Sequence, residues 1–259
     1  MRLETKSVSA GYGKHIVIPE LSISIPKGEI VSLIGANGSG KSTILKALAR
    51  LLKTSGGTVY LDGEDIHRID GRRLAKRLSI LPQLHHAPED LSVDDFVSYG
   101  RFPHNRAWTG FTAKDREAIG QALELTCLKK LKHRRMATLS GGERQRAWIA
   151  LNLAQEPQTM LLDEPTTFLD VRHQHETLEL IQRMNKTLGL TIVMVLHDIN
   201  HATRCSHRII AIKDGEVFRE GPPRELISSE LLLEVFGIAA QIIEHDGIPY
   251  FIPSKPAHD

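Results

Sequence analysis

The 259-residue chain is predicted to adopt an α/β fold. Three observations carry this prediction: short apolar runs typical of buried strands, helical patterning behind the first of them, and a glycine-rich loop set between a strand and a helix. Hydrophobic residues make up 41% of the sequence and charged residues 25%. Because this balance is ordinary for a folded globular protein, we expect a full hydrophobic core.

The first segment predicts an antiparallel sheet and the start of an α/β unit. Residues 21–25 (LSISI) alternate strictly between apolar and polar, and residues 57–63 (GTVYLDG) end in an Asp-Gly turn. Between them, residues 29–35 (EIVSLIG) form an apolar run that fits a strand buried on both faces, and residues 41–52 (KSTILKALARLL) have helical spacing. We therefore expect a strand, a glycine loop and a helix in succession.

Three later apolar strands are predicted, and each ends in polar residues. They cover residues 77–83 (RLSILPQ), 158–165 (QTMLLDEP) and 190–198 (LTIVMVLHD). Ligands of parallel sheets lie at the carboxyl ends of the strands. We therefore expect one site near the glycine loop to gather these polar side chains: Gln83, Asp163, Glu164 and His197.

The middle of the chain is predicted to be an inserted helical subdomain over about residues 84–157, because its patterning is mainly helical. After His197 we expect a hairpin around Asp214-Gly215, a helix over residues 223–237 and a small hairpin around Asp246-Gly247. The domain prediction is one domain over residues 1–236, which contains the helical insertion, followed by a C-terminal extension over residues 237–259.

Composition narrows the functional classes. A net charge of +2 is too close to balance to favour a nucleic-acid partner. The cysteines Cys127 and Cys205 fit neither a metal-binding spacing nor a disulfide framework, which suits a reducing compartment. No apolar run reaches the roughly 20 residues that span a bilayer. If the chain acts at a membrane, we expect partner subunits to provide the span.

The glycine loop matches the phosphate-binding pattern G-x-x-x-x-G-K-[ST] in the context that the motif requires, after a buried strand and before a helix. Its backbone N–H groups would face the phosphates, Lys41 would reach the outer phosphates, and Ser42 would ligate Mg²⁺. We expect a nucleoside triphosphate and Mg²⁺ to bind at this loop. The predicted nucleotide-binding residues of the loop are Gly35, Asn37, Gly38, Ser39, Gly40, Lys41, Ser42 and Thr43.

The polar strand ends supply candidates for hydrolysis. Asp163 suits the position near Mg²⁺, and Glu164 suits the general base that orients the attacking water. His197 is placed to hydrogen-bond the terminal phosphate or that water, although a single histidine at a strand end also fits a structural role. Gln83 can contact Mg²⁺ or water through its amide. We therefore assign Glu164, His197 and Gln83 to catalysis, and Ser42, Gln83 and Asp163 to the metal.

Tyr12 and the two basic runs can each be interpreted in two ways. The tyrosine ring can stack on adenine, or it can be a surface residue of the glycine-rich turn AGYG. The runs at residues 72–77 and 129–135 lack interleaved aromatic residues and fit solvated surfaces better than a nucleic-acid site. His85, His86 and His104 have no ligand partner at a convincing spacing, so no structural metal is expected.

A second predicted anion site follows Thr138. The segment TLSGGERQR places Ser140, Gly141 and Gly142 directly before an expected helix. A helix N-terminus carries about half an elementary positive charge and unpaired N–H donors, which suit a phosphate. A second phosphate site in a chain that already has a complete phosphate loop requires an explanation.

The ordered set of these segments resembles the ATP-binding cassette (ABC) ATPases over nearly the whole chain. The resemblance implies a P-loop NTPase with a RecA-like core, an antiparallel β subdomain and an inserted helical subdomain. It also implies that Ser140, Gly141 and Gly142 contact the γ-phosphate of ATP held by a second copy, in a head-to-tail dimer. Asp170 would then lie at the interface between the two copies. Position 168 is Phe where many members carry a small or polar residue, and we expect no effect on the chemistry.

The resemblance also favours a transport function. The family includes soluble proteins of DNA repair and translation, but those typically have two fused cassettes or a long coiled-coil insertion, which this chain lacks. Residues 81–104, 162–170 and 196–217 resemble importers of ferric siderophores, with haem, vitamin B12 or another metal as alternative cargo. The implied partners are a second copy of the chain, two permease subunits contacted by Gln83 and the helical subdomain, and an extracytoplasmic binding protein. The implied location is the cytoplasmic face of the membrane.

Overall fold

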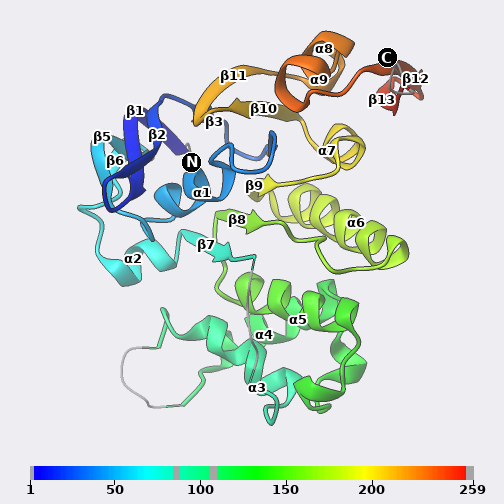
Figure 1. Cartoon of the computed structure of the whole chain (residues 1–259). Coiled ribbons are helices and arrows are strands. Elements are labelled where there is room, and N and C mark those ends of the chain that lie inside the picture. Colours follow the sequence, from blue (N-terminus) through cyan, green and yellow to red (C-terminus); the bar gives the residue numbers. More distant parts are fainter. Residues whose placement is uncertain (1–2, 84–87, 106–109, 255–259) are drawn as a thin grey trace. The chain divides into compact units, whose positions relative to one another are not determined.

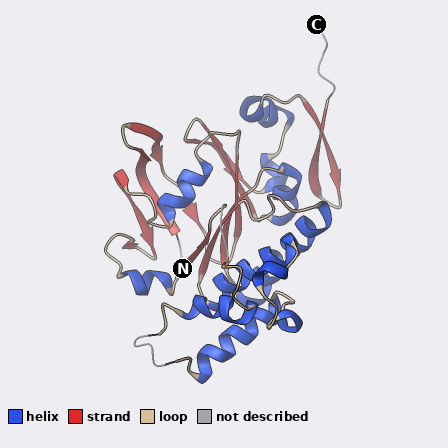
Figure 2. Ribbon diagram, turned by 60° about the horizontal axis from the view of Figure 1, so that its bottom comes forward, coloured by secondary structure: helices blue, strands red, loops and turns tan. Residues whose placement is uncertain are grey.

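The chain divides into two compact units in this computed structural model, which describes residues 3–83, 88–105 and 110–254 (Figure 1). The first unit consists of Met1–His67 and Thr191–Asp259, and the second of Arg68–Leu190. Strands make up much of the first unit, whereas helices dominate the second (Figure 2). The α/β class predicted from the sequence is confirmed.

The antiparallel sheet of the first unit has the strand order β2-β1-β5-β6, with β3 also pairing with β1. Its strands are β1 (Leu3–Tyr12), β2 (His15–Leu21), β3 (Ser24–Ile25), β5 (Thr54–Leu61) and β6 (Glu64–Asp65). The Asp62-Gly63 turn between β5 and β6 agrees with the sequence prediction, and both residues have positive φ.

The prediction of one continuous strand over residues 21–25 is wrong. β2 ends at Leu21, and β3 has only Ser24 and Ile25. The hydroxyl of Thr5 is the reason, because it donates to the Leu21 carbonyl at 2.9 Å and accepts from the Ile23 N–H at 2.9 Å. This buried side chain replaces part of the regular backbone ladder, so the strand is interrupted although burial still alternates over residues 21–25.

A mostly parallel sheet completes the first unit. β4 (Ile30–Ile34) pairs in parallel with both β9 (Thr191–Val195) and β10 (Arg208–Lys213), and β11 (Glu216–Gly221) runs antiparallel to β10. Every residue of β4 and β9 is buried, as expected for strands covered on both faces. The helices α1 (Lys41–Leu48) and α7 (Ile199–Cys205) follow β4 and β9 along the chain.

The C-terminal part of the first unit contains two helices and a hairpin. The single helix expected over residues 223–237 is instead α8 (Pro223–Leu226) and α9 (Ser229–Phe236). Ser228 separates them, because its side chain caps α9 by accepting from the Leu231 N–H. The hairpin of β12 (Ala240–His245) and β13 (Ile248–Pro253) agrees with the prediction.

The second unit holds a parallel strand pair and most of the helices. β7 (Leu78–Leu81) pairs in parallel with β8 (Thr159–Asp163), and all five residues of β8 are buried. Between these strands the described residues form helices and one isolated bridge, Ser92–Arg135. The α-helices of the unit are α2 (Gly71–Ala75), α3 (Val93–Ser98), α4 (Ala113–Leu125), α5 (Gly141–Ala154) and α6 (Val171–Leu188). Short 3₁₀ turns lie at Tyr99–Arg101, Lys129–Leu131 and Met136–Thr138.

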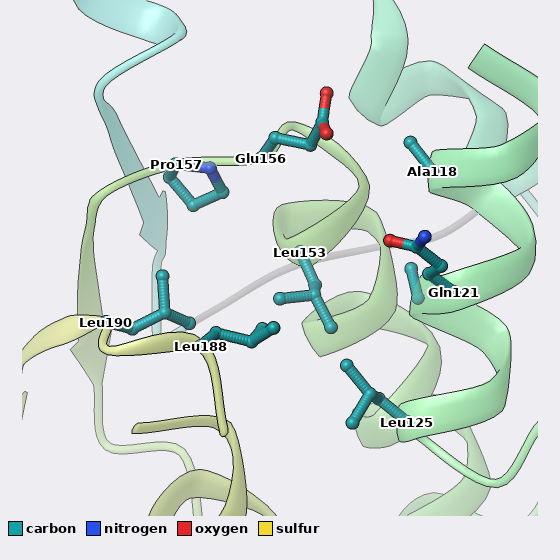
Figure 3. Close-up of a pocket in the computed structure, with 9 residues that line it drawn as sticks. Ala118, Gln121, Leu125, Leu153, Glu156, Pro157, Leu188 and Leu190 are labelled. Carbon is teal, nitrogen blue, oxygen red and sulfur yellow. The ribbon is translucent and has the colours of Figure 1, made fainter. Parts of the chain in front are cut away.

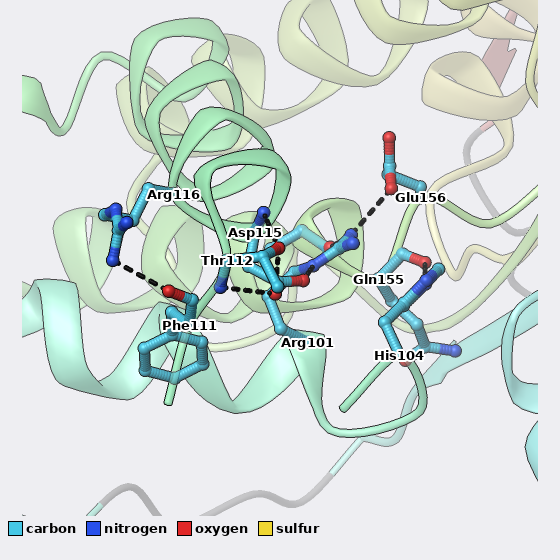
Figure 4. Close-up of polar contacts among 9 residues, drawn as sticks. Arg101, His104, Phe111, Thr112, Asp115, Arg116, Gln155 and Glu156 are labelled. Atoms are coloured by element: carbon cyan, nitrogen blue, oxygen red, sulfur yellow. Dashed lines mark hydrogen bonds and ion pairs between the residues drawn. The ribbon is translucent and has the colours of Figure 1, made fainter. Parts of the chain in front are cut away.

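A buried arginine holds the helices of the second unit together (Figure 4). Arg101 is 1% exposed, and its Nε donates to Oδ1 of Asp115 at 2.9 Å. Its Nη1 donates at 2.7 Å to both the Ala154 carbonyl and Oε2 of Glu156. Since an unpaired buried charge is costly, these partners join the start of α4 to the end of α5.

Asp115 also belongs to the capping box of α4. Its Oδ2 accepts from the backbone N–H and the hydroxyl of Thr112, and its own N–H donates to the Thr112 hydroxyl. Burial favours the neutral acid, but the hydrogen bonds from Thr112 and the Arg101 guanidinium outweigh it and lower the Asp115 pKa to about 2. The carboxylate is therefore charged at neutral pH.

Among the helices of the described residues, none combines the length and the apolar character that a membrane crossing requires.

Candidate nucleotide site

The phosphate loop joins β4 to α1 in the first unit. Gly35 follows the last residue of β4, and a Cβ at this position would overlap the Ile212 carbonyl. Gly40 caps α1 with φ of 97°, a conformation that favours glycine. Both glycines are therefore required by local backbone geometry, which lets the loop curl tightly before the helix.

Lys41 lies inside this loop and is 5% exposed. Its Nζ donates to the carbonyl oxygens of Gly35 at 2.9 Å and Ala36 at 2.8 Å. The positive charge is thus held at the loop, beside the N-terminus of α1, where an anion is favoured. The other predicted loop residues are Asn37 and Gly38, which are exposed, Ser39 and Thr43, which are buried, and Ser42, which is half-buried.

Tyr12 and His197 are further candidates in the first unit. Tyr12 ends β1 with 48% of its surface exposed, and Nζ of Lys46 lies 5.8 Å from its ring centroid. Lys46 also donates to the Tyr12 hydroxyl at 3.4 Å. His197 is exposed just after β9, the strand that pairs with the β4 strand leading into the phosphate loop. His197 thus lies at the carboxyl end of a neighbouring parallel strand.

The second unit brings Gln83 and Glu164 together. Gln83 follows β7 and Glu164 follows β8, and Nε2 of Gln83 donates to Oε2 of Glu164 at 2.7 Å. Thr167 donates to the same oxygen at 2.9 Å. Asp163, the last residue of β8, is 4% exposed. The side chain of Glu164 is therefore oriented from two directions, one of which, Thr167, the sequence analysis missed.

The segment Leu139–Gly142, called the LSGG segment below, leads into α5. Ser140 is the N-cap and accepts from the Glu143 N–H at 3.2 Å, while Oε2 of Glu143 accepts from the Ser140 N–H at 2.8 Å. The backbone hydrogen bond from Ser140 is the largest reason that the Glu143 pKa is lowered, although burial opposes it. Glu143 was missed as part of the segment, but the spacing S-x-x-E is the known pattern of a capping box.

Asp170 is the N-cap of α6 and is exposed. Its Oδ1 accepts from the backbone N–H of His173 at 2.9 Å and from Nδ1 of the same residue at 2.8 Å. The backbone hydrogen bond of His173 is the largest cause that lowers the Asp170 pKa. His173 was also missed, although its place three residues after an expected helix cap was a signal.

Two pockets of the second unit differ in the side chains that line them. One of about 190 Å³, shown in Figure 3, is lined by leucines from several helices and contains none of the predicted site residues. Another, of about 470 Å³, is lined mostly by charged residues of α5 and α6 and includes Ser140 and His173. The second pocket therefore adjoins the LSGG segment and Asp170.

No resident metal cluster of His, Cys, Asp and Glu is found among the residues with described positions. Nε2 of His104 is hydrogen-bonded to the Gln155 carbonyl at 2.9 Å, and burial is the main reason that the His104 pKa is lowered. His85 and His86 lie outside the described residues.

A comparison with protein-family models identifies the family of the chain. Residues 18–167 match the model of the ABC transporter family, which covers more than half of the chain. The chain belongs to the ABC transporter ATPases. Its P-loop NTPase fold, with an antiparallel subdomain, is that of an ABC cassette. The cassette binds and hydrolyses ATP to drive transport.

Curated relatives of this ABC ATPase cover most of its length. The iron(3+)-hydroxamate import ATP-binding protein FhuC of Bacillus subtilis is 48% identical over 93% of this chain and 90% of the relative. The ferric enterobactin transport ATP-binding protein FepC of Escherichia coli is 41% identical over 97% of this chain and 94% of the relative.

Solved structures of ABC proteins are similar as well. An ABC transporter described as metal-chelate type, in an inward-facing conformation, matches with a TM-score of 0.84 and 26% identity, over 98% of this chain and 97% of the other. A dimeric ATP-binding cassette bound to ADP and Pi matches with a TM-score of 0.72 and 31% identity, over 85% of this chain and 98% of the other. ABC cassettes thus dimerise and work with permeases in transporters.

Proposed function

We propose that this ABC ATPase energises the import of a ferric siderophore through a membrane permease. The observation that carries the proposal is the 48% identity, over nearly the full length of both chains, to the iron(3+)-hydroxamate import protein. The enterobactin relative transports a chemically different siderophore, so the shared property is the ferric chelate rather than one ligand. The proposed location is the cytoplasmic face of the membrane, and the partners include no nucleic acid.

The residues of the first unit bind the nucleotide in this proposal. Backbone N–H groups of the phosphate loop and the ammonium of Lys41 bind the phosphates, because both lie at the N-terminus of α1. Tyr12 stacks on adenine, since its ring is half-exposed at the end of β1. His197 hydrogen-bonds the terminal phosphate or the attacking water from the end of β9.

The donor groups present fit Mg²⁺, which prefers oxygen ligands. Ser42 supplies a hydroxyl, Asp163 a carboxylate and Gln83 an amide oxygen. Because Gln83 uses its Nε2 to bond Glu164, its carbonyl oxygen is the end that suits a cation. When bound, Mg²⁺ neutralises charge on the phosphates during transfer.

Glu164 is the proposed general base. Gln83 and Thr167 both donate to its Oε2, so the carboxylate is held in one orientation and Oε1 is assigned to the attacking water. Glu164 is also 9% exposed, and exclusion of solvent strengthens its interaction with the water that it orients. A positioned base of this kind typically contributes about 10² to 10⁴ in rate.

A second copy completes the site in the proposed assembly. Ser140, Gly141 and Gly142 contact the γ-phosphate held by the other copy, and Asp170 lies at the interface between the copies. The exposure of Ser140 and Gly141 at the N-terminus of a 14-residue helix supports this role. The proposed cassette spans residues 1–236, its helical subdomain about residues 84–157, and the C-terminal extension residues 237–259.

The permease contacts Gln83 and the helical subdomain in this assembly. Two copies of the chain then lie beneath two permease subunits, which an extracytoplasmic binding protein supplies with the ferric chelate. Closure of the two copies on ATP would move the helical subdomains and switch the permease.

Uptake of radioactive iron tests the cargo. Cells lacking the chain receive the parent, Lys41→Ala or the exposed-lysine control Lys186→Ala, and are supplied with an iron-loaded hydroxamate or catecholate siderophore. We expect uptake to be lost in the deletion strain and with Lys41→Ala, and to be restored by the parent and by Lys186→Ala. Uptake of every ferric siderophore unchanged by the deletion, together with loss of haem or cobalamin uptake, would contradict the proposed cargo.

A further inference from the structure

His173 links two segments to which the proposed function gives roles at the interface between copies. It lies in the first turn of α6, where its backbone N–H and Nδ1 both bond Oδ1 of Asp170. A backbone N–H contact to an N-cap is common to many helices. The additional bond from the ring is particular to this side chain and holds the exposed carboxylate in one rotamer.

The same ring packs against the LSGG segment. A Cβ at Gly142 would overlap the His173 ring, so Gly142 must be glycine because His173 lies against its backbone. The neighbouring Gly141 shows the contrast, since the nearest atom to a Cβ there is Cδ2 of Leu169 at 3.9 Å. The start of α5 and the start of α6 therefore meet at this one imidazole.

The charged side chains around His173 are engaged with one another. His173 lines the polar pocket of about 470 Å³, together with Arg146, Arg172 and Glu176. Glu176 accepts from Arg172 at 2.8 Å and from Arg146 at 3.3 Å. Asp170, in contrast, is bonded through its Oδ1 to His173, and this makes the imidazole the group that sets the direction of the Asp170 carboxylate.

We propose that His173 is a positioning residue of the ATPase, which fixes the Asp170 carboxylate relative to the backbone of Gly142. The proposal rests on the interface roles of Asp170 and the LSGG segment given above. His173 itself touches no reacting atom. Because one ring makes both contacts, Asp170 and the LSGG segment present a single arrangement to the second copy, and the ATP-bound pair closes without first ordering them separately.

Two substitutions separate the two contacts. His173→Phe keeps a ring against Gly142 and removes the hydrogen-bond donor. His173→Asn keeps a donor, because its amide nitrogen is as many bonds from Cα as Nδ1 is, and removes the ring. His175→Ala is the matched control, since His175 lies on the same helix and pairs with Glu179 at 3.0 Å. Steady-state ATP hydrolysis by each full-length variant gives kcat and KM.

We expect His173→Phe to lower kcat about tenfold with KM changed less than about twofold, the scale of one hydrogen bond to a charged group. The kcat of His173→Asn should lie within about threefold of the parent value. The kcat of His175→Ala should equal the parent value. Equal kcat for His173→Phe and the parent would overturn the proposal. A larger loss with His173→Asn than with His173→Phe would also overturn it, because ring packing rather than the bond to Asp170 would then dominate.

A second measurement uses the Glu164→Gln background, in which dimers are counted by light scattering with Mg-ATP. We expect His173→Phe to weaken the association of the two copies at saturating Mg-ATP about tenfold, in keeping with the nearly unchanged KM. A Glu164→Gln protein that stays monomeric would contradict the proposed two-copy assembly. A full dimer that His173→Phe leaves unchanged would contradict the positioning role instead.

Discussion

Gln83 donates a hydrogen bond from Nε2 to Oε2 of Glu164 at 2.7 Å, joining residues 81 positions apart in the sequence. The bond connects the segment after β7 to the segment after β8. In the proposed function, the first segment faces the permease and the second carries the general base. In that proposal, the contact is a direct route by which the permease changes the rate of hydrolysis.

Gln83→Ala is expected to lower kcat by about tenfold or more, because Glu164 loses one of the two donors that orient it. ATP hydrolysis measured over a range of ATP concentrations checks this. Gln121→Ala is the matched control, since Gln121 is an exposed amide that donates to Glu117 at 3.3 Å. An unchanged kcat for Gln83→Ala would remove Gln83 from the catalytic set.

Glu164→Gln is expected to lower kcat by about 10² to 10⁴ and to trap the ATP-bound dimer, because it removes the base and leaves the nucleotide contacts intact. Size-exclusion chromatography with light scattering in Mg-ATP gives the mass. The same protein without nucleotide is the control and should be monomeric. A monomer at saturating ATP and high protein concentration would contradict the model of two copies around shared nucleotides.

Tyr12→Ala is expected to weaken ATP binding by about 1 to 3 kcal/mol, the scale of one base–aromatic stack, whereas Tyr12→Phe keeps the ring and should change little. Calorimetric titration of ATP measures both. Lys46→Met is titrated as well, as the control for the lysine contact, because Lys46 donates to the Tyr12 hydroxyl. Equal affinity for Tyr12→Ala and the parent would leave Tyr12 as a turn residue.

Asp115 is expected to make stability depend on acid pH. Its pKa is lowered from 3.8 to about 2 in the folded chain, so its stabilisation is present above about pH 4 and is lost as pH falls towards 2. This shift of the Asp115 pKa corresponds to about 2 kcal/mol of folding free energy. Urea unfolding between pH 5 and 2 should show that the parent loses about this much more stability than Asp115→Asn. Asp90→Asn, at an exposed position, should follow the parent. Parallel curves for the parent and Asp115→Asn would contradict the assignment.

Local sequence predicted the elements whose signals lie within a few residues. The phosphate loop between β4 and α1 follows from glycine and lysine spacing, and the two hairpins follow from Asp-Gly turns with positive φ. The polar strand ends were predicted because parallel strands place their carboxyl ends together, and Gln83 and Glu164 do meet.

Local signals failed where a side-chain hydrogen bond decided the backbone. The alternation over residues 21–25 predicted a strand, but Thr5 takes hydrogen bonds that a continuous ladder would use. The apolar spacing over residues 223–237 predicted one helix, but the Ser228 cap begins a second. Each error has the same origin, since a periodic pattern records which face is buried and not which hydrogen bonds are available.

The sequence by itself determined the ABC ATPase family, the phosphate loop and the candidate residues at the strand ends, because motif spacing and periodicity are local properties of the chain. Tertiary structure alone decided that Gln83 donates to Oε2 of Glu164 and that the His173 ring lies against Gly142. Contacts of this kind depend on how helices and strands far apart in sequence pack, and packing is set by the whole core rather than by any one segment.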